Sequence, residues 1–243
     1  MSLESLAEPG TALLVLLLAG HFIGDALLPA SAAAAGRGRV RVLAMQVGLV
    51  FVVHGIVALP FLGLPAALAL LGLALVHPAL RGLRMRRASR GGLAGLLAIR
   101  IAHVLVVLGV WAGFRAIATP QAALLPAEWL AAWLPASVVL AAFAFNAAGG
   151  SEVVAAVLGP LGDASTSGRA GVGRLIGILE RTITLILILS GQWAAMALLA
   201  TAKSVARFDD LKDREFAEYY LVGTLTSLLV AIVIGLGLRG MGL

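Results

Sequence analysis

Long apolar runs constrain this chain more than any other feature of its sequence. Each run holds roughly 16 to 28 residues with few charges, and about 20 such residues cross the ~30 Å hydrocarbon layer as a helix. We expect spans at residues 11–31, 42–62, 65–80, 93–114, 129–148, 174–201 and 219–238. The sequence therefore predicts an all-α, polytopic integral membrane helix bundle with about seven transmembrane helices.

Composition and charge agree with a membrane location. Hydrophobic residues make up 61% of the 243 residues and charged residues 12%, whereas soluble domains are about 45–50% apolar and about 25% charged. The net charge is +6, but many arginines lie in two short segments beside apolar runs, where they act as topology signals. We therefore expect the lipid bilayer as a partner and no nucleic acid. The absence of cysteine excludes disulfides and thiolate metal sites.

The arginine-rich segments predict the orientation. Residues 37–41 lie between the first two spans and residues 81–90 between the third and fourth. Positive loops face the cytoplasm, so we expect both segments to be cytoplasmic loops. The acidic N-terminus then faces outward, and the first span stays in the mature protein.

A loop rich in glycine, serine and proline, residues 159–174, predicts the domain organisation. We expect a five-helix N-terminal membrane half, residues 1–158, with an intramembrane His/Asp core. The C-terminal half, residues 159–243, is expected to hold two membrane helices and a charged connector.

The N-terminal half carries all four histidines of the chain, one in each of the first four spans. They are His21, His54, His77 and His103, and Asp25 follows His21 by one helical turn. A rise of 1.5 Å per residue puts Asp25 and His77 nearer the cytoplasm and the other three near the middle. Ionisable groups at such depth need a partner or a cavity, so we expect a polar core shared by these helices.

Several chemistries fit that core, and the residues alone leave them open. His21, Asp25, His77 and His103 are candidate ligands of a divalent metal such as zinc or manganese. Histidines at equal depth on different helices are alternative axial ligands of haem b. A proton relay through Asp25 and simple hydrogen bonding between helices are the other readings.

The sixth span contains a regular polar pattern. Arg174, Arg181, Gln192 and Lys203 are separated by 7, 11 and 11 residues, which at 100° per residue aligns them on one face of a single long helix. We expect this stripe either to contact polar groups of neighbouring helices or to line a cavity, with Glu180 as the counter-charge. The segment after it, residues 206–220, is dense in both charges and predicts a helical, salt-bridged, exposed connector.

Several stretches resemble a known family. They are LLLAGHFIGD, VVHGIVAL, LALVHPALRGLR, IRIAHVLVVLG and, most specifically, residues 173–232. They are similar to the bacterial inner-membrane family catalogued as domain of unknown function 3307. The resemblance implies a multi-pass protein of the bacterial inner membrane and carries no established activity. The N-terminal half is also similar to membrane-bound metal-dependent hydrolase-like proteins.

This chain departs from the family pattern at acids that would attract a metal. In the family an Asp follows the third-span histidine by four residues and an Asp-Gln pair precedes the fourth-span histidine. Here Arg81, Ile99 and Arg100 occupy those positions. Positive charge weakens the field that would hold a cation, so we expect Arg81 or Arg100 to pair with Asp25.

Three functions follow as hypotheses. The first is an accessory or scaffolding membrane subunit that associates with other membrane proteins through a core including His54, Arg81, Arg100, Glu180, Arg181 and Gln192. The second is a membrane-bound metal-dependent hydrolase. The third is a proton-coupled carrier using Asp25, Glu180, Arg181 and Gln192, although no inverted repeat supports it.

Overall fold

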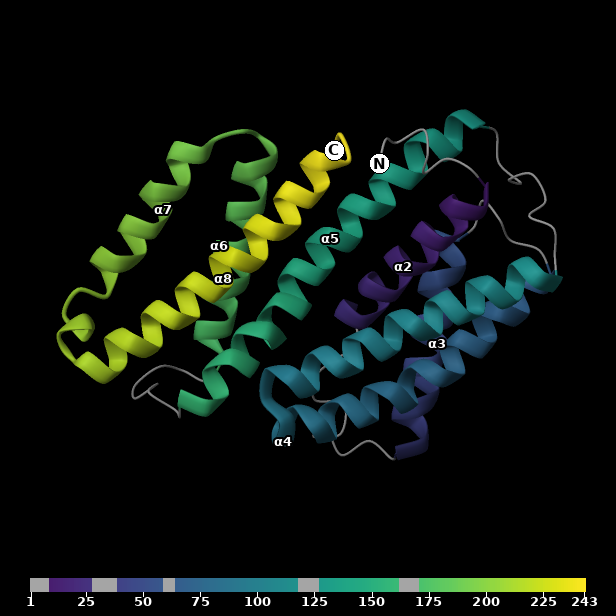
Figure 1. Cartoon of the computed structure of the whole chain (residues 1–243), viewed down its shortest axis with the longest axis horizontal. Helices are drawn as coiled ribbons and strands as arrows, with labels where there is room; N and C mark the ends of the chain where they lie inside the picture. The colour runs from purple at the N-terminus through teal and green to yellow at the C-terminus, as the bar shows by residue number, and fades with distance from the viewer. Residues whose placement is uncertain (1–8, 28–38, 59–63, 118–126, 162–170) are drawn as a thin grey trace. The chain divides into compact units, whose positions relative to one another are not determined.

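A computed structural model describes residues 9–27, 39–58, 64–117, 127–161 and 171–243. Apart from short turns these ranges are helical and contain no strand, which confirms the predicted all-α class for the described residues. The helices are α2 (Pro9–Leu27), α3 (Arg39–Val57), α4 (Leu64–Ile117), α5 (Ala127–Leu158), α6 (Val172–Leu189), α7 (Trp193–Ala206) and α8 (Arg214–Gly240), with short 3₁₀ turns η2 (Gly159–Leu161) and η3 (Asp210–Lys212) (Figure 1).

Three helical segments are long and apolar enough to cross a membrane, judged by length and composition. They are Gly92–Gly113, Ala131–Leu161 and Arg214–Gly240. Shorter apolar helices lie at Thr11–Leu27, Ala44–Val57 and Trp193–Ala206. Within the described residues, this supports association with a membrane.

The chain divides into two compact units, unit 1 (Met1–Ala144) and unit 2 (Phe145–Leu243). The boundary falls inside α5, whereas the sequence predicted a division at residue 158/159. Close packing explains the earlier boundary, because a Cβ on Gly150 of α5 would lie only 2.8 Å from Nε of Arg181 on α6. The end of α5 therefore belongs with the C-terminal helices.

In unit 1, α2 packs against both α3 and α4. Two apolar clusters fix it there. One joins Leu16 and Ile23 of α2 to Val53 of α3, and the other joins Leu13 and Leu17 of α2 to α4. Small residues bring α2 and α3 close together, because a Cβ on Gly20 would lie 3.0 Å from the ring of His54.

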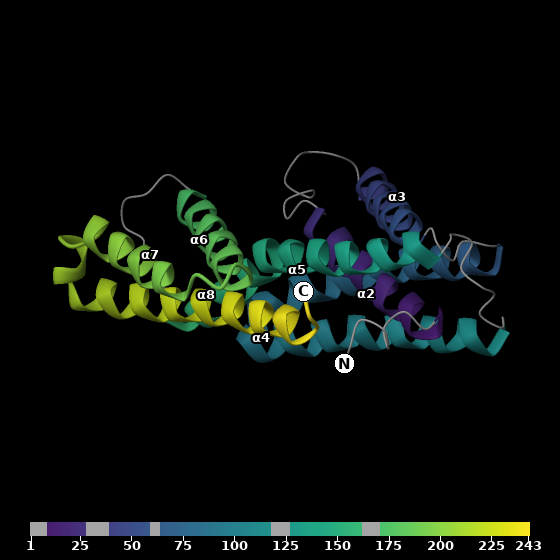
Figure 2. The same cartoon turned by 90° about the horizontal axis from the view of Figure 1, so that it is seen from above.

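Helix α4 is two helices joined at Gly92, where the backbone turns sharply (φ 52°, ψ −144°). The two arms run back along one another (Figures 1 and 2), and Leu70 and Leu73 of the first share a core with Val107 of the second. The expected loop at 81–90 was wrong, since its backbone is helical. Leucine, arginine, methionine and alanine are good helix formers, so the chain turns only at the glycines that follow.

In unit 2 the expected single helix over residues 174–201 was also wrong. It breaks at Ser190–Gln192 into α6 and α7. Gly191 takes the left-handed conformation (φ 72°), and its N–H and that of Gln192 donate to carbonyls of Ile188 and Leu187. These bonds form a Schellman motif, which closes a helix at a glycine.

The chain returns through α7 and then along α8, which packs extensively on α6. Gly235 permits that contact, because a Cβ there would lie 2.6 Å from Ile188 Cγ2. The predicted charged connector, residues 206–220, is mostly exposed and is salt-bridged, with ion pairs Arg207–Asp210 and Lys212–Asp209 before α8 and Arg214–Glu218 in its first turns. It is helical only in part. Asp213 begins α8 by accepting a hydrogen bond from the Phe216 N–H, as N-cap aspartates do.

Candidate functional site: two buried polar clusters

An ion pair lies at the centre of the polar cluster in unit 1. Arg100 Nη1 donates to Asp25 Oδ2 at 2.7 Å, and the two side chains are 14% and 4% exposed. Of the two arginines expected as partners of Asp25, the structure therefore pairs Arg100. The side chain of Arg81 lies outside the described residues. The pair joins α2 to the second arm of α4.

Three histidines, one on α2, one on α3 and one on the second arm of α4, are buried in unit 1; they are His21, His54 and His103. The rings of His21 and His103 are in contact, with centroids 5.3 Å apart. His54 packs on the other side, against Gly20 and Gly24 of α2. The predicted middle tier of histidines is therefore gathered around one helix.

Hydrogen bonds to backbone carbonyls indicate the tautomer of two of these histidines. Nδ1 of His54 lies 2.8 Å from the Val50 carbonyl, and Nδ1 of His103 lies 2.8 Å from the Ile99 carbonyl. A carbonyl only accepts, so both histidines donate through Nδ1 and direct Nε2 inward as an acceptor when neutral. Nε2 of His54 is buried and has no hydrogen-bond partner among the described residues.

The four expected metal ligands come together only in part. His21, Asp25 and His103 lie in one cluster, while the side chain of His77 lies outside the described residues. In the part of the chain that the structure describes, no three histidine, aspartate or glutamate side chains form a group that could hold a metal ion. Arg100 occupies the carboxylate of Asp25. The described residues alone therefore do not build a metal site.

The second cluster surrounds Arg181 in unit 2, which is only 2% exposed. Its guanidinium makes four hydrogen bonds to neutral oxygens. Nε donates to the Asn146 carbonyl at 2.8 Å, Nη2 to the Ala147 carbonyl at 3.2 Å and to Ser151 Oγ at 2.6 Å, and Nη1 to Ser227 Oγ at 3.2 Å. Asn146 Nδ2 donates in return to the Arg181 carbonyl at 2.9 Å. The arginine thus joins α5, α6 and α8.

Sequence reasoning found Arg181 but missed its acceptors. Asn146 and Ser151 flank the pair Gly149–Gly150 in an otherwise apolar stretch of α5. An asparagine near two adjacent glycines in an apolar helix could have indicated this site. Glycine has no side chain, so a long polar side chain of a neighbouring helix can approach the backbone there. Gly150 has this role, since a Cβ there would collide with Arg181.

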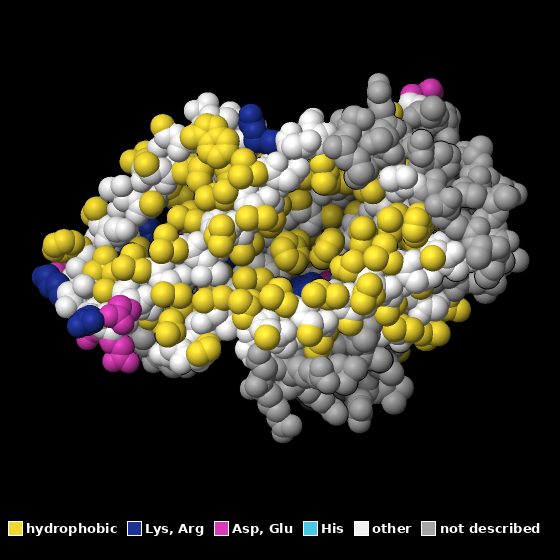
Figure 3. Space-filling model, in the orientation of Figure 1, with side chains coloured by type: hydrophobic (Ala, Val, Ile, Leu, Met, Phe, Trp, Pro, Cys, Tyr) yellow, Lys and Arg dark blue, Asp and Glu magenta, His cyan; other side chains and the backbone are white. Residues whose placement is uncertain are grey.

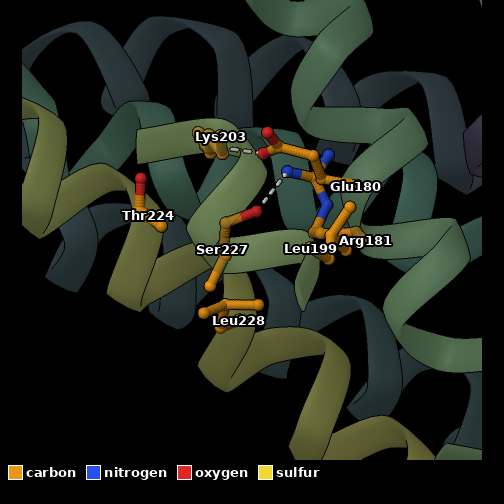
Figure 4. A pocket seen from close by; sticks show the side chains of 8 residues that line it. Glu180, Arg181, Leu199, Lys203, Thr224, Ser227 and Leu228 are labelled. Atoms are coloured by element: carbon orange, nitrogen blue, oxygen red, sulfur yellow. Dashed lines mark hydrogen bonds and ion pairs between the residues drawn. The ribbon is translucent and has the colours of Figure 1, made fainter. Parts of the chain in front are cut away.

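Glu180 and Lys203 form a second ion pair beside Arg181, with Lys203 Nζ donating to Glu180 Oε2 at 2.6 Å. Figure 4 shows this pair and the Arg181–Ser227 hydrogen bond at one pocket between α6, α7 and α8. The expected alignment of four polar residues along one helix is therefore wrong. Lys203 meets Glu180 because α7 folds back, whereas Gln192 and Arg174 are exposed.

Arg239 secures the opposite end of the same helices. Its Nη1 donates to the carbonyls of Ile188 and Leu189 at 3.1 and 3.3 Å, and its guanidinium lies 5.9 Å from the ring centre of Trp193. Carbonyls at a helix C-terminus lack partners within the helix, so a cation there is favourable. The turn between α6 and α7 is thereby fixed to α8.

Comparison of the chain with protein-family models, curated proteins and solved structures found no match. Any function must therefore be argued from the two clusters and from the surfaces of the helices.

Proposed function

We propose that the chain is a multi-pass protein of the bacterial inner membrane that serves as an accessory or scaffolding subunit. The observation that carries this proposal is the buried ion pair between Asp25 and Arg100. Asp25 is the carboxylate that a metal or a relayed proton would use. With an arginine bound to it, its role is to hold α2 against α4, so the polar core specifies packing.

The helix surfaces support the same proposal. Large apolar side chains are exposed on every helix from α2 to α8, and none of the residues of α7 is buried. Figure 3 shows hydrophobic side chains spread over the described part of one face, with charges gathered at the connector end of α7 and α8. Such surfaces suit lipid chains and the apolar helices of another membrane subunit.

The hairpin of α6 and α7 changes the membrane topology that we propose. Both arms are apolar, and a crossing by each raises the number of crossings from about seven to eight. At 1.5 Å per residue the 14 residues of α7 extend about 21 Å, which a locally thinned bilayer accommodates. The charged connector then faces the cytoplasm with residues 37–41 and 81–90, and α8 ends outside.

Membership in the bacterial family catalogued as domain of unknown function 3307 is part of the proposal and rests on the sequence stretches quoted above. The departures at Arg81, Ile99 and Arg100 favour a structural core over a metal centre. The paired state of Arg100 agrees with that interpretation.

The decisive test is the assembly state of the chain in its own membrane. A chromosomally tagged chain is extracted in a mild detergent without chelator, and its mass is measured by native mass spectrometry. We expect a stoichiometric complex with another membrane protein, heavier than the 24.8 kDa chain. The tagged Asp25→Asn variant is expected to lose the complex, because α2 is then poorly held. The double variant Asp25→Asn/Arg100→Gln, without an unpaired charge, retains it.

Two results would overturn the proposal. One is a monodisperse isolated chain in every mild detergent and in native lipid discs. The other is one zinc or manganese ion per chain in elemental analysis, lost in the Asp25→Asn variant. That result would favour the metal-dependent hydrolase instead.

A further inference from the structure

The pocket in unit 2 carries an imbalance of charge. Its polar lining consists of Glu180 and Arg181 from α6, Lys203 from α7, and Thr224 and Ser227 from α8, and its other residues are apolar. Two cations and one carboxylate give the lining a net charge of +1. Lys203 already holds the carboxylate, so Arg181 is left with neutral hydrogen-bond partners in the described part of the chain. Glu180 is the one carboxylate of the lining and is shared by two cations, and buried positive charge in excess of its counter-charge is costly.

Hydrogen-bond donors remain at the same place. A guanidinium has five N–H groups and an ammonium has three. Four of the five on Arg181 are used by the oxygens of α5 and α8, which leaves one on Nη1. Lys203 directs one N–H to Glu180 and lies 5.2 Å from the centre of the Tyr220 ring. Ser227 accepts from Arg181 and can donate its own proton.

The size of the pocket limits what these donors bind. Its free volume is about 10 Å³, which corresponds to one water-sized group. A single anionic oxygen has that size, while a larger planar or aromatic group does not. The pocket is also partly open, so the rest of the ligand can remain outside it.

The position of the pocket indicates where that oxygen comes from. Lys203 lies three residues before the end of α7 at Ala206, about 5 Å along the helix axis. The charged connector begins immediately afterwards, with Arg207, Asp209 and Asp210. Such a segment lies in the headgroup region when the helices cross a bilayer. The pocket is therefore just below the level of lipid phosphates.

We propose that unit 2 binds one phosphate group, with an anionic oxygen in this pocket accepting hydrogen bonds from Lys203, Arg181 and Ser227. The phosphodiester of a membrane phospholipid is the source that fits the position. Its single negative charge balances the lining. Charge-assisted hydrogen bonds from lysine and arginine are the usual means of phosphate recognition. The proposal stands independently of the scaffolding function.

The chain offers a matched control for testing this site, because Lys203 and Lys212 are its only lysines. Lys212 lies in the exposed connector, paired with Asp209. The full chain and its Lys203→Met, Lys203→Arg and Lys212→Met variants are purified, stripped of lipid in detergent and titrated with phosphatidylglycerol or inorganic phosphate. Bound phosphatidylglycerol is counted by native mass spectrometry, and thermal stability is measured in each titration.

We expect the unmodified chain and Lys212→Met to bind one phosphatidylglycerol per chain with equal affinity. Lys203→Met is expected to bind roughly tenfold more weakly, as the loss of one charge-assisted hydrogen bond implies, and Lys203→Arg restores much of the affinity. Equal stabilisation by inorganic phosphate would assign the site to free phosphate. The proposal is overturned if neither probe binds, or if Lys203→Met and Lys212→Met bind alike. Helix content and elution volume establish that each variant is folded.

Discussion

Each unit of this protein buries an arginine, and the two arginines are held in different ways. Arg100 in unit 1 has an acidic partner, with 2.7 Å between its Nη1 and Asp25 Oδ2. Arg181 in unit 2 donates four hydrogen bonds to two backbone carbonyls and two serine hydroxyls. An acid cancels the charge of an arginine, whereas neutral oxygens only replace the water it has lost.

The difference determines what each cluster can do. In unit 1 Asp25 and Arg100 match each other in charge, so removing either one takes this counter-charge from the other. In unit 2 the arginine bonds to carbonyls of α5, which are already part of the helix, and to two serine hydroxyls, of which that of Ser151 also donates to the Ala147 carbonyl. Removing Arg181 therefore leaves few polar groups without a hydrogen-bond partner. In the unmodified chain its charge is available to an anion from outside. The buried charges of unit 1 are therefore balanced by its own residues, while the proposed ligand balances the charge of the pocket in unit 2.

Breaking the matched pair is expected to give the largest effect. In Asp25→Asn, Arg100 keeps its charge in a largely buried place and loses the Asp25 carboxylate, and breaking a buried pair from one side costs about 3–5 kcal/mol. We expect the free energy of unfolding, measured by SDS titration in mixed micelles, to fall by about that amount. Metal content should not change.

The double variant Asp25→Asn/Arg100→Gln is the control for this prediction. It removes both charges, and we expect it to recover most of the lost stability, since replacing a buried pair by uncharged residues is often neutral. A double variant as unstable as Asp25→Asn would contradict the ion-pair interpretation. A single variant with unchanged unfolding would show that the pair contributes little.

The sequence predicted much of unit 1 because its signals are long or charged. Apolar runs locate helices by length alone, and the departures from the family pattern offered Arg81 and Arg100 as partners of Asp25, of which the structure pairs Arg100. Arg100 lies seven residues into the span expected at residues 93–114, at about the depth that the helical rise assigns to Asp25. An ionisable side chain in hydrocarbon needs a partner or a cavity, so each such residue has few possible partners.

The structure of unit 2 depended on signals that hydropathy does not contain. The break at Ser190–Gln192 hardly interrupts the apolar run or the 100° periodicity. The sequence therefore predicted that the four polar residues Arg174, Arg181, Gln192 and Lys203 share one face of a single helix. Gly191 was the informative residue, because only a glycine readily takes the left-handed position of a Schellman motif. The acceptors of Arg181 were missed because backbone carbonyls of α5 have no sequence signature.

Replacing the unmatched arginine is expected to give a smaller effect than breaking the ion pair. In Arg181→Met a flexible apolar side chain fills the space, and both serine hydroxyls can bond within their own helices. We expect the free energy of unfolding to change by about 1 kcal/mol or less, measured by the same SDS titration in lipid-free detergent. A loss comparable to that of Asp25→Asn would show that Arg181 has a matched charge after all. Added phosphatidylglycerol should stabilise the unmodified chain more than this variant.

The smallest effect is expected at an ion pair that water surrounds. Arg214 Nε lies 3.0 Å from Glu218 Oε1, a slightly longer contact than the 2.7 Å between Arg100 and Asp25, and the two side chains are 93% and 67% exposed. Water and salt screen such a pair, and holding two long side chains together costs conformational entropy. We therefore expect no measurable change in the unfolding midpoint for Arg214→Gln or Glu218→Gln at physiological salt. A clear loss in either variant, persisting at high salt, would mean that the connector is buried against another molecule.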